Sequence, residues 1–266
     1  MVSDGSYNYI ARYVDDVMCF SKNPQAIIDH VSQSYTMKGV GYPQFYLGGD
    51  VVELPPSSRS HNISSYSLFA HTYINNCLVN LERMCQTTFK PSSVPFSISY
   101  HAVLDQSAFC SPLDMTHYRS FLWSANWMIT LGRFDIAYAV NTLAQYCCVP
   151  RLGHLHALQH IFGYLKLHPH GMLLVDTSLP PGWNHAVFQK DCDWAEFFPD
   201  ALEDIPSGCP PAFGDPLHIT TYVDADHAWD NVTSRFVTDI LLLVNNTPIA
   251  WLSKRLRTVE TSPFGS

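Results

Sequence analysis

The stretch Tyr9-Ile-Ala-Arg-Tyr-Val-Asp-Asp-Val-Met-Cys-Phe-Ser21 says most about this chain. Apolar and β-favouring residues lead to two adjacent carboxylates, Asp15 and Asp16, and then resume, which predicts a β-hairpin with the acids at its turn. Neighbouring aspartates repel each other, and a divalent cation that prefers oxygen ligands, such as Mg²⁺, would stabilise the pair. Such carboxylates hold the ions of two-metal phosphoryl transfer. Tight turns also favour aspartate for backbone reasons, so an exposed turn without metal is the alternative.

The residues after the hairpin predict a helix and then a second hairpin. Asn23 and Pro24 supply an N-cap and a first helical residue, and apolar residues then recur at helical spacing as far as Tyr35. The segment Lys38-Gly-Val-Gly-Tyr-Pro-Gln-Phe-Tyr-Leu-Gly-Gly-Asp50 follows, and a second hairpin is expected at its Leu-Gly pair.

This order of elements resembles the palm of a copia-type retrotransposon reverse transcriptase, whose active-site hairpin carries a tyrosine-x-Asp-Asp motif like that at Tyr13–Asp16. By that resemblance Asp15 and Asp16 are catalytic and bind Mg²⁺. The second hairpin would pack under the palm and help to grip the primer strand. The resemblance therefore implies these substrate-binding residues: Tyr13, Phe45, Tyr46, Leu47 and Gly48.

Residues 113 to about 170 are the most strongly helical part of the sequence. Asp114 is expected to cap a helix that stops at Leu131-Gly132, and further helices are expected from about Phe134 and from about Gly153. The strings Tyr-Arg-Ser-Phe-Leu, Gly-Arg-Phe-Asp-Ile-Ala-Tyr-Ala-Val and Phe-Gly-Tyr-Leu-Lys in this region resemble the copia-family connection between polymerase and ribonuclease H. The resemblance gives this region a scaffold role.

The last part of the chain predicts a strand ending in acids, His218-Ile-Thr-Thr-Tyr-Val-Asp-Ala-Asp-His-Ala-Trp229, and then a strand hairpin turning at Asn245-Asn246-Thr247. This pattern resembles the start of a ribonuclease H domain. The resemblance makes Asp224 a catalytic residue and the first metal-binding carboxylate of that domain. A strand-end aspartate facing water is the alternative.

Charge and composition limit what the isolated chain can do. Its 266 residues carry a formal charge of −8, whereas a protein that holds a nucleic-acid duplex usually presents a basic channel. Seven acids and no Lys or Arg lie between Asp191 and Asp215, in a Pro-rich segment expected to be a linker or surface loop. The charge argues against strong nucleic-acid binding by this chain alone.

The remaining composition points to a reducing compartment. The eight cysteines show no Cys-x-x-Cys pairing and are expected to be buried thiols. His154, His156 and His160 lack a further ligand at a suitable spacing, so solvated or helix-capping imidazoles are favoured over zinc. No apolar run is long enough for a membrane span and no signal sequence is present, so no membrane association and a cytoplasmic or nuclear location are expected.

The fold class expected is α+β: a partial reverse-transcriptase palm, a helical connection region and a truncated ribonuclease H-like β-sheet. Its segments are a palm remnant (1–54), a thumb-like region (55–112), the helical connection (113–180), an acidic Pro-rich linker (181–216) and the N-terminal part of a ribonuclease H-like domain (217–266).

The resemblance implies a fragment of an RNA-directed DNA polymerase with ribonuclease H, a magnesium-dependent nucleotidyltransferase of a transposable element. The fingers, the first palm carboxylate and the later ribonuclease H acids are not found, so the chain is expected to be inactive alone. It would act with an RNA template and a DNA primer only as part of a larger Pol polyprotein. The alternative from another class is a domesticated protein-interaction module without catalysis, which binds through residues 113–170.

Overall fold

The computed structural model describes residues 2–3, 6–55, 65–97, 99–179, 208–209, 217–226 and 237–256. The chain divides into two compact units, one built from Met1–Gly41 and Leu179–His218, the other from Tyr42–Ser178 and Ile219–Ser266. The described residues contain both helices and antiparallel strands, so the predicted α+β class is confirmed. The assignments to palm, connection and ribonuclease H, and the five segments, stay predictions.

The first unit contains the predicted hairpin and helix. Its described elements are β1 (Val2–Ser3), β2 (Ser6–Tyr7), β3 (Tyr9–Tyr13), β4 (Asp16–Phe20) and α1 (Pro24–Ser32). Asn23 caps α1 as predicted, because its side-chain oxygen accepts a hydrogen bond from the backbone N–H of Ala26 at 3.3 Å.

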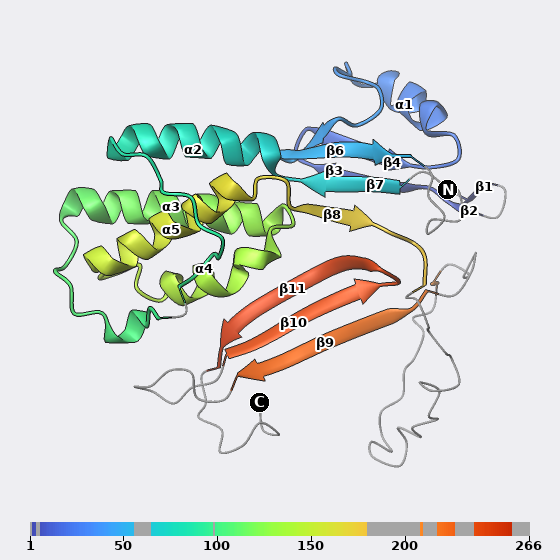
Figure 1. Ribbon diagram of the computed structural model, residues 1–266. Coiled ribbons are helices and arrows are strands. Elements are labelled where there is room, and N and C mark those ends of the chain that lie inside the picture. Colours follow the sequence, from blue (N-terminus) through green and yellow to red (C-terminus); the bar gives the residue numbers. More distant parts are fainter. Residues whose placement is uncertain are drawn as a thin grey trace, which may run out of the picture. The chain divides into compact units, whose positions relative to one another are not determined.

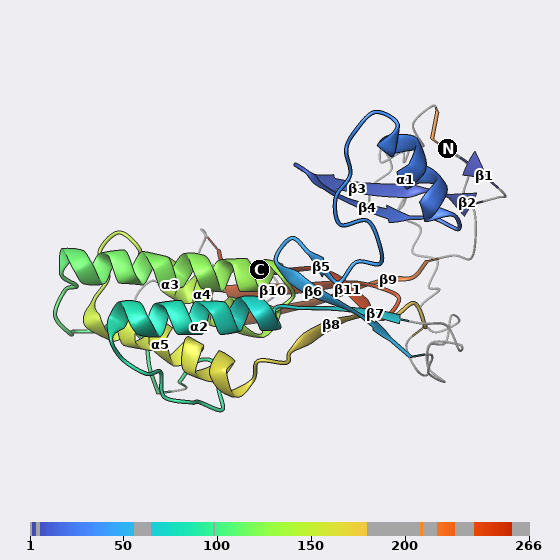
Figure 2. The ribbon, with the colours of Figure 1, turned by 90° about the horizontal axis from the view of Figure 1, so that it is seen from above.

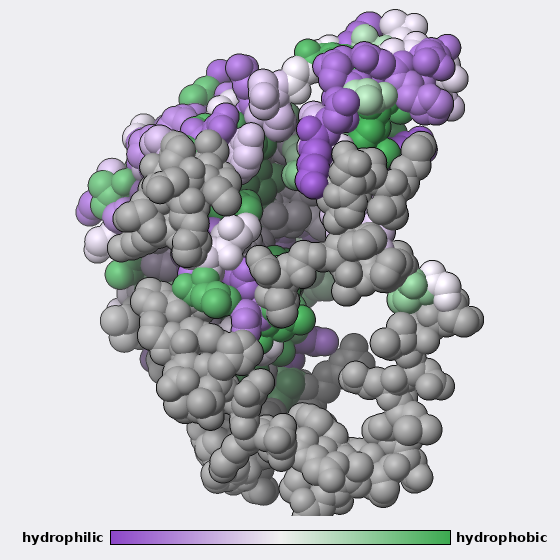
Figure 3. All heavy atoms as spheres, turned by 90° about the vertical axis from the view of Figure 1, so that its right-hand side faces the viewer, coloured by the Kyte–Doolittle hydropathy of each residue, from purple (hydrophilic) through white to green (hydrophobic). Residues whose placement is uncertain are grey.

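The hairpin and α1 do not enclose a core of their own. No residue of α1 is buried, and four large side chains of the hairpin, Tyr9, Ile10, Tyr13 and Phe20, are each more than half exposed. In Figure 3, green hydrophobic residues reach the surface among purple hydrophilic ones. A two-stranded hairpin is marginally stable by itself, so this part of the chain depends on further packing.

The second hairpin belongs to a larger sheet in the second unit (Figure 1). Strands β5 (Phe45–Tyr46), β6 (Gly49–Leu54), β7 (Ser65–Phe69) and β8 (Met172–Val175) form a four-stranded antiparallel sheet in that order. Neither β7 nor β8 was expected from the sequence. Phe69 is the last residue of β7 and lies opposite both Asp50 and Met172. The hairpin therefore pairs with strands outside the expected palm remnant.

The helical layer holds the core of the second unit. It consists of α2 (His71–Cys85), η1 (Ala102–Leu104), α3 (Pro112–Thr130), η2 (Phe134–Ile136), α4 (Ala137–Ala144) and α5 (Leu152–Leu167). Figure 2 shows α2, α3 and α5 side by side, and α3 packs against α2, α4 and α5. Fully buried core side chains include Ile74, Tyr118, Phe121, Met128, Leu143, Leu158, Ile161, Phe162 and Leu165.

The ends of α3 follow from local chemistry, with one correction to the sequence-based expectation. The N-cap is Ser111, and Asp114 is the third helical residue of a capping box with it. The Asp114 carboxyl accepts hydrogen bonds from the hydroxyl and the backbone N–H of Ser111, and these bonds lower its pKa below the usual value. The bond from the hydroxyl has the larger effect. The helix stops at Leu131 as predicted, because Gly132 adopts a φ of +98°, which favours glycine.

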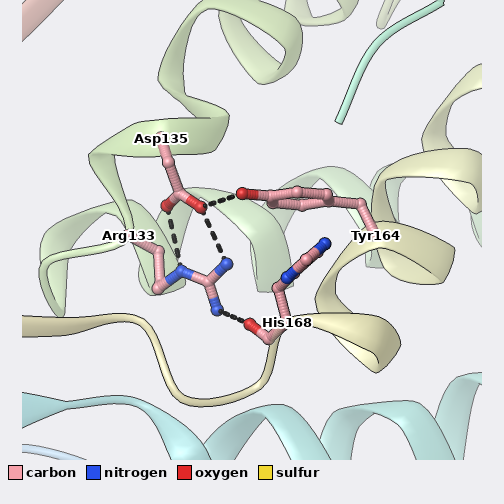
Figure 4. A network of polar contacts seen from close by, with 4 residues as sticks. All are labelled: Arg133, Asp135, Tyr164 and His168. Carbon is pink, nitrogen blue, oxygen red and sulfur yellow. Dashed lines mark hydrogen bonds and ion pairs between the residues drawn. The ribbon is translucent and has the colours of Figure 1, made fainter. Parts of the chain in front are cut away.

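An ion pair between a buried arginine and an exposed aspartate lies where η2 meets the end of α5 (Figure 4). The Arg133 side chain is 2% exposed, and its Nε and Nη2 donate to the two carboxylate oxygens of Asp135 at 2.9 and 2.8 Å. Arg133 Nη1 donates to the carbonyl of His168, and the Tyr164 hydroxyl donates to Asp135, both at 2.8 Å. This network joins η2 to the C-terminal end of α5.

The C-terminal strands form a sheet of their own and pack on the helices. Strands β9 (Ile219–Asp226), β10 (Val237–Val244) and β11 (Thr247–Arg255) are antiparallel in the order β11-β10-β9. Trp251 Nε1 donates to the carbonyl of Ile129 at 3.1 Å, and Asn141 Nδ2 donates to that of Ser253 at 2.8 Å. This three-stranded sheet lies in the same compact unit as the helical layer.

Candidate functional site

The predicted active-site hairpin has the shortest turn that can join its strands. Tyr13 and Asp16 are directly opposite in the β3–β4 ladder, and Val14 and Asp15 form the turn between them. Arg12 Nε donates to the Val14 carbonyl at 3.1 Å, which supports the turn from one side. The hairpin prediction is confirmed, and it brings Tyr13, Asp15 and Asp16 together.

Val14 holds an unusual backbone conformation at this turn. Its φ is +53°, in the left-handed region, which two-residue hairpin turns require but β-branched residues rarely adopt. The conformation costs about 1–2 kcal/mol relative to an ordinary one. Glycine or asparagine would avoid most of this cost. Strain of this kind concentrates at functional sites, so the turn itself marks this hairpin as a candidate.

The two carboxylates at the turn are open to a ligand. Asp15 and Asp16 are exposed, and neither accepts a hydrogen bond from the part of the chain that the structure describes. Their oxygens are the donor type that Mg²⁺ prefers, and the exposure leaves room for the several waters that Mg²⁺ keeps. The donor set thus fits Mg²⁺, although the described residues contain no group of three or more His, Cys, Asp or Glu that could hold a metal.

The second predicted group, Phe45 to Gly48, forms the β5–β6 hairpin. Leu47 and Gly48 occupy its turn with φ of +51° and +87°, the pattern of a primed turn with both central residues left-handed. A Cβ on Gly48 would lie 3.2 Å from Trp127 Nε1, so this glycine also permits close packing on α3. The hairpin lies in the second unit, whereas Tyr13, Asp15 and Asp16 lie in the first.

Asp50, beside this hairpin, has a structural role. Its carboxylate accepts hydrogen bonds from the backbone N–H and the hydroxyl of Thr72, at 2.8 and 2.7 Å. A carboxylate at the first turn of a helix satisfies a free N–H and interacts favourably with the helix dipole. Asp50 therefore ties the sheet to the start of α2.

Asp224, the third predicted carboxylate, lies on the edge strand β9 and is exposed. Directly opposite it on β10 is Asp239, and opposite Asp239 on β11 is Ser253. Sequence reasoning missed Asp239. The available signal was a single acid in the otherwise apolar and neutral strand Val237–Val244.

The expectation of buried cysteines is wrong for most of those that the structure describes, since only Cys110 is buried and Cys148 and Cys209 are exposed. His154 Nδ1 accepts a hydrogen bond from the backbone N–H of Arg151 at 3.1 Å, and its Nε2 lies 3.0 Å from the Ala102 carbonyl. His160 Nε2 lies 3.0 Å from the Ser92 hydroxyl. These contacts hold the two imidazoles in the packing around α5. The cysteines among the described residues are free thiols, and none of the described helices is long and apolar enough to cross a membrane.

Three known proteins resemble this chain over nearly its whole length. The retrovirus-related Pol polyproteins from transposons RE1 and RE2 of Arabidopsis thaliana are 26% and 24% identical over 96% of the chain, which covers 14% of each. A putative transposon Ty5-1 protein of Saccharomyces cerevisiae is 26% identical over 98% of the chain and 70% of its own length. No family model matches. No solved structure matches either.

The chain is therefore related to retrovirus-related Pol polyproteins of transposons, as its motifs predicted. More particularly, it is similar to one segment of the copia-type polyproteins of RE1 and RE2, and it spans about a seventh of their length, since it covers 14% of each. The catalytic and substrate-binding roles of the individual residues stay predictions.

Proposed function

We propose that this chain is the part of a transposon Pol polyprotein that carries the polymerase active-site hairpin and the beginning of ribonuclease H. The complete polyprotein would copy element RNA into DNA by two-metal phosphoryl transfer. The observation that carries the proposal is the Tyr13–Asp16 hairpin, whose strained turn holds two exposed carboxylates without hydrogen bonds from described residues. The similarity to Pol polyproteins along the whole chain supports it.

The proposal gives each group a separate task. Asp15 and Asp16 would bind Mg²⁺, which supplies charge stabilisation at the reacting phosphate. Tyr13 and the hairpin from Phe45 to Gly48 would contact the template–primer duplex, and Asp224 would be the first carboxylate of ribonuclease H. Cytoplasmic or nuclear location belongs to the same proposal.

The isolated chain is expected to bind Mg²⁺ weakly and to be inactive. Two carboxylates leave most coordination positions of an ion to water, and catalysis needs two ions held about 3.5–4 Å apart. The charge of −8 adds repulsion against a nucleic-acid duplex. A magnesium titration followed by NMR of the Asp15 and Asp16 carboxyl carbons would measure this affinity. Saturation at micromolar metal would contradict the weak site.

A segment exchange tests the polymerase role. The corresponding segment of the RE1 polyprotein is replaced by this chain, and Mg²⁺-dependent primer extension on an RNA template is measured for the chimera and for the isolated chain. Only the chimera is expected to be active. Asp15→Asn or Asp16→Asn should lower its rate roughly hundredfold or more, because asparagine brings no charge to the ions.

The matched control is Asp29→Asn, which removes one acid from α1 and leaves the hairpin intact. Its extension rate should equal that of the parent chimera. A folded chimera that extends primers equally well without Asp15, or that is inactive with both hairpin aspartates present, would show that the proposed role is wrong.

A further inference from the structure

Two cysteines stand next to each other in the turn that joins α4 to α5. Cys147 and Cys148 follow α4, which ends at Ala144, and precede α5, which begins at Leu152. Cys148 is exposed, Cys147 is half-buried, and both are free thiols. The other described cysteines have no cysteine beside them in the sequence: Cys19, Cys77, Cys85, Cys110 and Cys209. This turn therefore presents a pair of adjacent thiols with access to solvent.

The two thiols lie close enough to interact, since a side-chain hydrogen bond joins Cys147 and Cys148. Burial and the neighbouring Cys148 thiol raise the pKa of Cys147, and the positive charge of Arg119 acts against this rise. Only a thiolate is a good nucleophile. The exposed Cys148 is therefore the thiol that first meets a reagent from solution, and Cys147 is the neighbour that reacts second.

The backbone of the turn is held only weakly at this pair. The N–H of Cys147 donates to the Ala144 carbonyl at 3.3 Å, and the N–H of Val149 donates to the Tyr146 carbonyl at 3.2 Å. Ordinary N–H···O bonds are about 2.7–3.2 Å long, so both are at the long end of the range or beyond it. A change of conformation at the two cysteines would thus give up little hydrogen bonding.

The chain on both sides of the turn is held more firmly. The Tyr118 hydroxyl donates to the Leu143 carbonyl at 2.6 Å, near the end of α4. The N–H of Cys110 donates at 3.0 Å to the carbonyl of Pro150, which is buried. These contacts confine a change at the cysteines to the turn and leave the packing of the helices in place.

A disulfide between adjacent cysteines is strained. Consecutive Cα atoms lie about 3.8 Å apart across a trans peptide bond, whereas a disulfide usually joins Cα atoms about 4.4–6.8 Å apart. Strain makes a disulfide easier to reduce, and strained or exposed disulfides have the more oxidising potentials. Such a bond is suited to a reversible change and not to a permanent cross-link.

We propose that Cys147 and Cys148 form a site of reversible thiol–disulfide exchange, which a low-molecular-weight disulfide oxidises to a disulfide between the two neighbours. With glutathione disulfide, the Cys148 thiolate attacks one sulfur and releases one glutathione, which leaves a mixed disulfide. The Cys147 thiolate then attacks the Cys148 sulfur and releases the second glutathione. The protein gives up two electrons and two thiol protons, and both glutathione molecules leave as thiols. Neither polymerisation nor ribonuclease H activity takes part.

Phenylarsine oxide tests whether both sulfurs can bond to one atom. Its arsenic bonds to two thiols, and its oxygen leaves with their protons as water. The folded full chain should bind the reagent at this pair. Cys147→Ser and Cys148→Ser should each weaken that binding roughly hundredfold or more, because one thiol then replaces two. Cys209→Ser, which removes another exposed cysteine, is the matched control and should leave the affinity unchanged.

Equilibration with mixtures of reduced and oxidised glutathione tests the exchange itself. After acid quenching, mass spectrometry of the peptide that contains both cysteines should show the loss of two hydrogens, and an excess of reduced glutathione should reverse it. Cys147→Ser should instead keep a glutathione on Cys148, because no neighbouring thiol displaces it. In urea, ring closure must order a free backbone, so the oxidised fraction at the same glutathione ratio should be several-fold lower.

The proposal is overturned by any of three results. The first is that phenylarsine oxide binds the folded parent chain no more tightly than it binds Cys148→Ser. The second is that the oxidised parent chain keeps glutathione on Cys148 or forms a bridge from this pair to Cys110. The third is an oxidised fraction in urea that equals or exceeds that of the folded chain, which would mean that the turn does not favour the exchange.

Discussion

Removing the carboxylate of Asp135 should destabilise the second unit strongly. Breaking a buried ion pair by deleting one partner costs about 3–5 kcal/mol, because the other charge stays buried without compensation. Arg133 is 2% exposed, whereas the Asp135 side chain is 36% exposed. Arg133 also keeps its bond to the His168 carbonyl. Asp135→Ala should therefore lower the free energy of unfolding by about 3 kcal/mol, the lower end of that range.

Urea unfolding followed by far-ultraviolet circular dichroism measures this loss. Tyr164→Phe, which deletes only the hydroxyl that donates to Asp135, is the matched control and should cost about 1 kcal/mol. Arg133→Met combined with Asp135→Ala should cost less than the sum of the two single changes, since no charge is left unpaired. The reasoning is refuted if Asp135→Ala costs less than about 1 kcal/mol or if the two changes are additive.

Two further predictions concern stability. Gly163→Ala should destabilise the second unit by about 1–3 kcal/mol or more, because a Cβ at this position would lie 2.1 Å from the backbone oxygen of Lys90. Gly41→Ala is the control. A Cβ on Gly41 would have no atom within 4 Å, so this change should have little effect on the unfolding midpoint. Burial acts to raise the pKa of the Glu82 carboxyl, but the hydrogen bonds that it accepts, first from Lys166, bring the net pKa below the ordinary 4.5. The stabilisation by the Glu82–Lys166 pair should therefore be complete above the pKa of Glu82 in the unfolded chain and lost as the pH falls through its lower pKa in the folded chain. The melting temperature of Glu82→Gln should fall less steeply with acid than that of the parent chain. An equally steep fall would contradict the role given to Glu82.

Local pattern was sufficient for elements whose contacts are close in sequence. The helical periodicity predicted α3 and α5, the Asp-Asp turn predicted the first hairpin, and the asparagine turn predicted β10 and β11. Strand β8 could not be predicted in this way. Its four residues follow α5 and gain their conformation from pairing with β7, which lies before α2 in the sequence. No signal within a short window encodes such a partner.

In the candidate sites, too, local sequence predicted only the features that depend on neighbouring residues. The motif at Tyr13–Asp16 gave the hairpin and its exposed acids, but the left-handed backbone of Val14 is visible only in three dimensions. Asp239 was overlooked because its meaning depends on the register that puts it opposite Asp224. A single strand with one acid predicts nothing about a neighbour across the sheet.

The pairing of β8 with β7 has a consequence for synthesis of the protein on the ribosome. Strand β7 emerges early, but the residues that cover its free edge, Met172–Val175, emerge only after α5 has been made. During this interval the nascent chain presents an unpaired strand edge, which can associate with other chains. Closing so long a loop is slow relative to forming local helices. The helical layer should therefore assemble first and deliver β8 to the sheet as the last step, and ribosomes that stall before Met172 should release an aggregation-prone product.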